Sequence, residues 1–243
     1  MTTDALSTVK AQYSTPAVIR EYSTVGMFPA EARIVSQFIP EGSEVLELGC
    51  GAGRVTVDMA KRGYRMTGVD LMPTMLAVAK EQAEANGVEI DLRVMDVTEM
   101  TFSPESYSCV YYSFNGLEQI PGRARRQKVL EDVYRILEPG GTFILTTRSG
   151  LAIGKRAIAW LLIIGRYLLS RATGTNPEME LGDRCWNGFY CFYINPFRIR
   201  AVCRALGFHL KYFNAEPYIN RGKKAALRSN FSNARMIFYV FKK

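Results

Sequence analysis

Short apolar runs alternate with longer segments of mixed polarity along most of this chain. The runs at residues 44–48, 65–69, 90–94, 108–113 and 142–147 have the length and composition of buried strands. The segments between them at 53–62, 73–86 and 122–137 carry apolar residues at helical spacing. Strands that alternate with helices predict βαβ units around a parallel sheet.

Both ends of the chain extend this pattern. A polar N-terminal region at about residues 5–40 predicts helices before the first strand. Near the C-terminus, a helix is predicted at 196–206, with a stop at Gly207, and strands at 209–216 and 234–241. The connection at 217–233 shows no helical apolar period. A connection without a helix suits an antiparallel pair, since parallel neighbours need a crossover.

Residues 148–195 interrupt the alternation of strands and helices. They contain a basic amphipathic helix candidate at 152–171, followed by the aromatic sequence WNGFYCFY at 186–193. We predict that they form an inserted cap, packed over the open edge of the sheet where a ligand binds. The expected organisation is a helical flap at 1–40, an α/β core at 41–147, the cap at 148–195, and a terminal helix with two strands at 196–243.

Composition and charge restrict the possible folds, compartments and partners only slightly. With 243 residues, of which 48% are hydrophobic and 22% charged, the chain is long enough for one sizeable α/β domain. Its five cysteines lack metal-ligand or disulfide spacing, so we expect no metal and a reduced, cytoplasmic protein. No signal peptide is recognisable, and the longest apolar stretch, at 157–165, is too short to span a bilayer. The net charge of +8 permits a nucleic acid, an anionic membrane or an acidic substrate as partner, although many soluble enzymes that bind none of these share it.

The most informative segment is VLELGCGAGR at 45–54, where an apolar run breaks into Gly49, Gly51 and Gly53. A buried strand that leads through a tight turn into a helix offers backbone N–H groups and a positive helix end to a nucleotide-like ligand. The G-x-G-x-G spacing is one residue shorter than the dinucleotide fingerprint. This difference argues against a dinucleotide.

Three acidic residues indicate which ligand binds instead. Glu47, two residues before the first glycine, would repel a pyrophosphate but suits an ammonium or sulfonium group. Asp70 ends the second strand 21 residues after Gly49 (70 − 49 = 21), where a carboxylate accepts hydrogen bonds from ribose hydroxyls. Asp96 follows the third strand and is placed to accept a hydrogen bond from an adenine amino group. These residues predict an adenosine with a positively charged, phosphate-free tail.

Four motifs, VLELGCGAGR, GVDLMPTML, RVMDV and ILEPGGTFIL, resemble in order and spacing those of class I S-adenosylmethionine-dependent methyltransferases. The resemblance covers roughly residues 40–147 and extends more loosely through the C-terminal helix and strands. It implies an α/β Rossmann-like fold with a seven-stranded, mostly parallel sheet, an antiparallel last strand and helices on both faces. It also implies S-adenosyl-L-methionine as the cofactor.

The resemblance assigns the methionine moiety to the glycine turn with Glu47, and the ribose hydroxyls to Asp70. Residues after the second and third strands would surround the adenine, and those after the fourth strand would lie beneath the sulfonium. The full set of expected cofactor-binding residues is Glu47, Gly49, Gly51, Gly53, Asp70, Leu71, Met72, Asp96, Val97, Ser113 and Asn115.

Methyl transfer from a sulfonium is an in-line displacement in which the protein mainly aligns the reacting atoms. The only histidine, His209, is expected in a strand remote from the methyl group, so a histidine base is not expected. Many small-molecule members carry histidines where this chain has Glu118, which is the candidate base or a partner for a cationic acceptor. The candidate acceptor-binding residues are Tyr13 and Tyr22 in the flap, and Trp186 and Tyr190 in the cap.

Three acceptor classes remain open, and we favour a small molecule enclosed by the aromatic cap. A lipid or prenyl-quinone is the alternative, because the basic helix with Trp and Leu at 152–171 suits peripheral contact with a membrane. RNA is disfavoured, since the basic loop at 221–224 lacks interleaved aromatics. A non-enzymatic cofactor-binding protein also remains open, and the sequence sets neither the methylated atom nor the oligomeric state.

Overall fold

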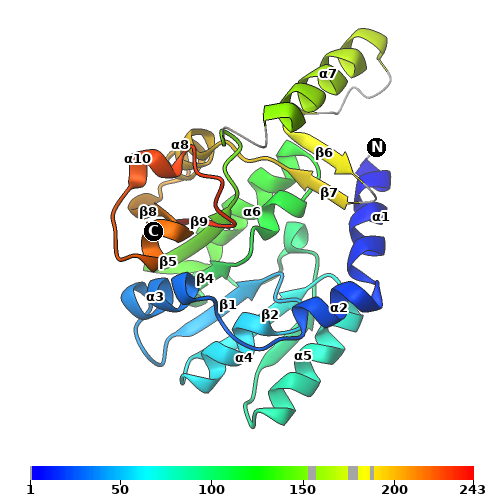
Figure 1. The fold of residues 1–243 in the computed structure, drawn as a ribbon. Coiled ribbons are helices and arrows are strands. Elements are labelled where there is room, and N and C mark those ends of the chain that lie inside the picture. The colour runs from blue at the N-terminus through cyan, green and yellow to red at the C-terminus, as the bar shows by residue number, and fades with distance from the viewer. Residues whose placement is uncertain (1, 153–156, 175–179, 187–188) are drawn as a thin grey trace.

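Figure 1 shows the fold in a computed structural model, which describes residues 2–152, 157–174, 180–186 and 189–243. Its central sheet has seven strands in the order β3-β2-β1-β4-β5-β9-β8. Neighbouring strands are parallel, except that β9 runs antiparallel to β5 and β8. This confirms the predicted Rossmann-like class with its antiparallel last strand. The strands are β1 (Glu44–Leu48), β2 (Arg65–Asp70), β3 (Asp91–Val94), β4 (Tyr107–Tyr112), β5 (Leu137–Thr147), β8 (His209–Ala215) and β9 (Ile237–Lys242).

Alternating side chains along each strand divide the core into two layers. In β1, Leu46 belongs to one layer and its neighbour Val45 to the other. In β5, Phe143 and Ile144 are divided in the same way. Because successive side chains of a strand point to opposite faces, apolar runs without polar alternation are what a sheet buried on both faces requires.

Helices cover both faces of this sheet. On one face lie α3 (Pro29–Phe38) and α4 (Arg54–Lys61), and on the other α6 (Arg123–Ile136) and α8 (Pro196–Ala205). This arrangement confirms the predicted helices on both faces. The remaining helices are α1 (Thr2–Tyr13), α2 (Pro16–Tyr22), α5 (Pro73–Ala85), α7 (Ala157–Thr173), α9 (Glu216–Asn220), α10 (Ala226–Ser229) and the 3₁₀ helices η1 (Val97–Glu99) and η2 (Gly116–Gln119).

The segment between β5 and α8 contains α7 and a separate antiparallel hairpin of β6 (Asp183–Trp186) and β7 (Phe189–Phe192). β7 contacts both α1 and η2, so the hairpin connects the N-terminal helices with the core. α7 instead projects from the body of the molecule (Figure 1) and does not lie over the edge of the sheet. Within the described residues, no helix is both long enough and apolar enough to cross a bilayer.

Two local expectations differ from the structure. The connection 217–233, expected to lack helices, contains most of α9 and all of α10. These helices have five and four residues, which is too short to produce an apolar period. The fifth strand, expected at 142–147, already begins at Leu137, which pairs with Tyr107.

Candidate active site

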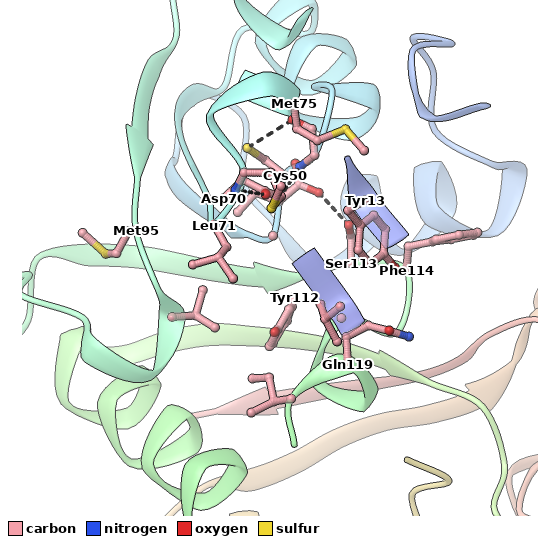
Figure 2. Close-up of a pocket in the computed structure, with 18 of the residues that line it drawn as sticks. Tyr13, Cys50, Asp70, Leu71, Met75, Met95, Tyr112, Ser113, Phe114 and Gln119 are labelled. Atoms are coloured by element: carbon pink, nitrogen blue, oxygen red, sulfur yellow. Dashed lines mark hydrogen bonds between the residues drawn. The ribbon is translucent and has the colours of Figure 1, made fainter. Parts of the chain in front are cut away.

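The carboxyl ends of three parallel strands form a cleft, here called the strand-end cleft. Glu47 lies near the end of β1, Asp70 ends β2, and Ser113 follows β4. The cleft lies where the strand order reverses between β1 and β4, which is the usual ligand position in open α/β sheets. Figure 2 shows Cys50 and Asp70 on one side of the cleft, with Tyr13 and Ser113 on the other.

The flap helices α1 and α2 nearly close the strand-end cleft. Val9, Tyr13 and Tyr22 form part of its wall. The cleft encloses about 150 Å³, below the roughly 300 Å³ at which small-molecule sites begin. A nucleoside-sized ligand therefore needs a wider cleft, and α1 and α2 supply part of the wall that would open. The Tyr13 and Tyr22 rings pack edge to face with centroids 5.9 Å apart, and burial raises the pKa of the Tyr13 hydroxyl.

The glycine turn has two structural roles. Gly49 and Gly51 adopt positive φ angles of 66° and 55° and line the cleft, so the backbone reverses there without a side chain in the way. Gly53 does not line the cleft. A Cβ atom at Gly53 would lie 3.1 Å from the side chains of Ala79 and Val57, so this glycine allows α4 to pack against α5.

Glu47 is a buried carboxyl at the cleft wall, with only 1% of its surface exposed. Ser113 Oγ donates a hydrogen bond to its Oε1 at 2.6 Å, and Thr56 Oγ1 donates to its Oε2. Burial raises the pKa of Glu47 to about 7, although the two hydroxyl donors and the nearby Arg54 favour the carboxylate. In the described part of the chain, Glu47 forms no ion pair, so a cationic ligand would compensate its charge.

Asp70 joins the glycine turn to the turn that follows β2. The Gly51 N–H donates to its Oδ2 at 2.8 Å, and the Met72 N–H donates to its Oδ1 at 2.9 Å. Burial raises the pKa of Asp70, and the backbone donors partly oppose this. Each carboxylate oxygen has a second acceptor position, so Asp70 can still accept hydrogen bonds from a diol.

Asp96 carries an ion pair that the sequence did not predict. Arg125, in the first turn of α6, donates from Nη2 to Asp96 Oδ2 at 3.0 Å. Thr98 donates to Oδ1 from its backbone N at 2.9 Å and from Oγ1 at 2.7 Å. Arg125 itself lines the cleft. A ligand amino group at Asp96 would therefore share this carboxylate with a guanidinium.

A second ion pair, more deeply buried than the first, fixes α3 to the helix that follows the glycine turn. Arg54, the first residue of α4, makes two parallel 2.7 Å hydrogen bonds to Glu31 of α3. Arg54 also donates to the Gly26 carbonyl at 2.9 Å, and its guanidinium lies 4.4 Å from the centre of the Phe28 ring. The pair is almost fully buried, with side-chain exposures of 12% and 0%.

Glu118 is fully buried and does not line the strand-end cleft, although its neighbour Gln119 does. Arg148 donates to Glu118 twice, from its backbone N at 2.5 Å and from Nη1 at 2.8 Å. Cys191 Sγ lies 3.6 Å from the same carboxylate. Burial raises the pKa of Glu118 to about 7 against the effect of Arg148. Glu118 thereby joins η2 to the end of β5 and to β7.

The structure brings most of the expected site residues together. The expected cofactor residues that line the strand-end cleft are Glu47, Gly49, Gly51, Asp70, Leu71, Met72, Asp96, Val97 and Ser113. Asn115 lies outside the wall, where its N–H donates to Thr146 Oγ1 at 2.8 Å and its Nδ2 donates to the Arg235 carbonyl at 3.2 Å.

The cap holds the other two acceptor-binding candidates, Trp186 and Tyr190. Tyr190 donates from its hydroxyl to Asp183 Oδ1 at 2.7 Å and is not part of the cleft wall, while the Trp186 side chain lies outside the described residues. Val9 and Arg125 also line the wall, although the sequence did not predict them there. They come from α1 and α6, and no motif of their own marks them.

The chemistry of the residues that line the cleft suits S-adenosylmethionine as a ligand. Its glycine turn leaves room for a ligand at the end of β1, its buried Glu47 suits a cationic group, and Asp70 suits a ribose. Within the described residues, no cluster of His, Cys, Asp or Glu has the arrangement of a metal site. The fold and the site therefore define an S-adenosylmethionine-binding enzyme of the Rossmann-like type.

Comparison with known proteins agrees with this class. A family model described as a methyltransferase domain matches residues 45–141. A ubiquinone biosynthesis O-methyltransferase from Pseudomonas aeruginosa (strain UCBPP-PA14) is 33% identical over 170 residues, covering 70% of this chain and 66% of that protein. Its counterpart from Xylella fastidiosa (strain 9a5c) is 24% identical over 200 residues, covering 80% and 74%.

A solved structure supports the fold independently. A SAM-dependent methyltransferase from Methanosarcina mazei aligns with a TM-score of 0.66 at 20% identity, covering 90% of this chain and 99% of that chain. The chain belongs to the class I S-adenosylmethionine-dependent methyltransferases. The predicted enzyme class and cofactor are thus confirmed.

Proposed function

We propose that the strand-end cleft holds S-adenosyl-L-methionine through the residues that the sequence predicted. Glu47 would hold the cationic methionine end, and Asp70 would accept hydrogen bonds from the ribose. When bound, the cofactor supplies a methyl group on a positively charged sulfur. The chain's own contribution is to fix the orientation of both reactants and to exclude water, which is worth about 7–11 kcal/mol in well-aligned reactions.

The acceptor is proposed to be a small molecule that binds beneath the α1–α2 flap. The observation that carries this proposal is the aromatic wall opposite Asp70. Tyr22 packs against Tyr13 on one side and against Phe114 on the other, with ring centroids 5.9 Å and 5.8 Å apart. All three rings line the cleft, where they would exclude water from a bound acceptor. Trp186 and Tyr190 remain predictions as acceptor-binding residues.

Glu118 remains the candidate base, and its pKa near 7 suits that role. Both of its oxygens accept hydrogen bonds from Arg148, so proton abstraction requires this contact to open. The alternative is that Glu118 positions η2. Glu118→Gln separates the two roles. Loss of a base lowers kcat and removes an ionisation near pH 7 from its pH profile, whereas loss of positioning raises KM and leaves the profile unchanged.

A lipid or prenyl-quinone acceptor at a membrane surface is the second candidate, and α7 favours it. A set of aliphatic side chains on α7 is 38–70% exposed: Leu161, Leu162, Ile164, Leu168 and Leu169. At 3.6 residues per turn these side chains share one face, with Arg166 on one border and Arg171 on the other. A leucine face bordered by arginines suits an interface with anionic lipids. The names of the relatives, which refer to ubiquinone biosynthesis, are consistent with this candidate.

The expected cytoplasmic location belongs to the same proposal. Four of the described cysteines, Cys50, Cys109, Cys191 and Cys203, are free thiols, which suits a reducing compartment. A nucleic acid acceptor is not proposed, since relatives and site give no support for one.

The test uses S-adenosylmethionine labelled on its methyl group, incubated with the purified protein and fractionated extract. Label in water-soluble metabolites supports the small-molecule acceptor, and label in the extracted lipids supports the second candidate. Label in RNA would overturn both. Denatured protein is the control for non-enzymatic transfer.

Membrane contact is tested separately by sedimentation with phosphatidylglycerol-containing vesicles. Leu168→Glu together with Leu169→Glu should abolish binding. Leu227→Glu is the matched control, because Leu227 is 73% exposed on α10, outside the α7 face. Equal binding by the wild type and both variants would rule out α7 as the membrane contact.

A further inference from the structure

A second cavity, here called the cap groove, lies between α6, α8, β7 and the first turns of α7. It encloses about 700 Å³, compared with about 150 Å³ for the strand-end cleft. No described residue lines both cavities. They meet at η2, where Leu117 faces the cap groove, while Gly116 and Gln119 face the strand-end cleft.

The wall of the cap groove is mainly apolar. Leu117, Leu130, Phe192 and Ile199 come from four different elements and are all buried. Leu161 also belongs to the wall, yet its side chain is 70% exposed. The groove therefore opens beside the leucine face of α7. An apolar cavity of this size, continuous with exposed leucines, has the properties of a site for a hydrocarbon chain.

Two arginines at the groove add uncompensated positive charge. Arg123 of α6 and Arg198 of α8 are exposed and line the groove. Within the described residues, neither guanidinium has a hydrogen-bond or ion-pair partner. The neighbouring Arg126 differs, because it donates to Glu180 at 2.5 Å and lies 3.6 Å from the centre of the Phe192 ring. Arg126 is thus part of the wall, whereas Arg123 and Arg198 are available to an anion.

We propose that the cap groove binds the hydrocarbon chain of an amphiphile whose anionic group is held by Arg123 and Arg198. The short helix η2 lies between this groove and the strand-end cleft, so the bound hydrocarbon chain lies next to the methyl-transfer site. Such an amphiphile is therefore the proposed class of methyl acceptor. The proposal rests on the second candidate function, a lipophilic acceptor. It adds a defined chain site and a required negative charge.

The probe is oleate, titrated by calorimetry below its micelle-forming concentration, with oleyl alcohol as the uncharged analogue. Leu161→Glu should weaken oleate binding about tenfold, because it places a carboxylate in the groove wall. Leu162→Glu is the matched control on the same helix, since Leu162 is exposed but does not line the groove. Arg123→Gln with Arg198→Gln should weaken oleate about tenfold and leave oleyl alcohol unchanged. Arg204→Gln, elsewhere on α8, should change neither.

Saturable 1:1 oleate binding with this pattern supports the proposal. The absence of saturable oleate binding overturns the proposal. Equal effects of Leu161→Glu and Leu162→Glu also overturn it, because adsorption of oleate to the α7 face would then explain the measured heat of binding. Loss of oleate affinity in the Arg204 variant would also overturn it. Calorimetry with S-adenosylmethionine on the same samples reports the strand-end cleft. A failure of the cap groove to bind oleate is therefore distinguishable from a failure of the proposed methyltransferase function.

Discussion

The strand-end cleft and the cap groove lie on two sides of η2, yet they are built in opposite ways. The cleft gathers polar groups at the ends of neighbouring strands, with Glu47 and Asp70 held by backbone and hydroxyl donors. The groove gathers apolar side chains from residues as far apart as Leu117 and Val202. Fixed hydrogen bonds specify one ligand closely, whereas an apolar groove selects mainly by size and hydrophobicity. Cofactor binding is therefore expected to respond to single substitutions at the cleft, while chain binding responds to charge and volume at the groove.

The largest effect is expected from the ion pair beneath the cleft. Arg54→Ala leaves the fully buried Glu31 without its partner and should lower the free energy of unfolding by about 3–5 kcal/mol. Arg62→Ala, also near α4, removes an exposed pair with Asp58 and should cost at most about 1 kcal/mol. Urea denaturation measures both values. Similar losses for the two variants would contradict the structural role of the buried pair.

Asp70→Ala should weaken S-adenosylmethionine about a hundredfold, because two charge-assisted hydrogen bonds to the ribose are lost. Oleate binding in the cap groove should not change, since Asp70 belongs only to the strand-end cleft. Asp91→Ala, at an exposed acid of β3, is the control for a change in net charge. Unchanged cofactor affinity in Asp70→Ala would refute the ribose assignment.

The raised pKa of Glu47 predicts a pH dependence of cofactor binding. Below its pKa of about 7 the carboxyl is protonated and must lose a proton to hold a cation, so affinity rises with pH and levels off above 7. Between pH 8 and pH 6 the affinity should fall about tenfold. Glu47→Gln should bind more weakly at pH 8, with a flat profile. A wild-type profile that is equally flat would mean that Glu47 does not hold the cationic end.

The smallest effect concerns the flap. Lys10 and Arg20 are exposed on α1 and α2, which form part of the cleft wall and are expected to move when the cofactor enters. S-adenosylmethionine should slow tryptic cleavage at these two sites several-fold by holding the flap closed. Oleate should not protect them. Mass spectrometry of timed digests gives the rates, and protection by oleate alone would reverse the assignment of the two cavities.

The contrast between the strand-end cleft and the cap groove also explains which site residues could be predicted from the sequence. Glu47, Asp70 and Asp96 were predictable because each lies at or just after the carboxyl end of a predicted strand, and the ends of parallel strands meet at one edge. Gly53 was expected at the ligand but allows α4 to pack closely against α5, a role that only the neighbouring Ala79 reveals. Arg125 could not be predicted, since its contact with Asp96 joins two segments whose relative position depends on the whole sheet.

The cap was predictable as an insertion but not in its form. Its hairpin is fixed by long-range contacts such as Cys191 with Glu118, and the pattern of apolar residues along 148–195 contains no trace of them. The exposed face of α7 was predicted only as an alternative, because an apolar helix has the same sequence pattern whether its leucines are buried or exposed.

The most direct test of the central claim is calorimetric titration of the purified wild-type protein with S-adenosylmethionine at pH 8, with S-adenosylhomocysteine and NAD as competitors. We predict one saturable site, displaced by S-adenosylhomocysteine and unaffected by NAD, because Glu47 at the strand end favours a cation and disfavours a pyrophosphate. Absence of saturable binding, or displacement by NAD at comparable concentration, would contradict the assignment of the strand-end cleft.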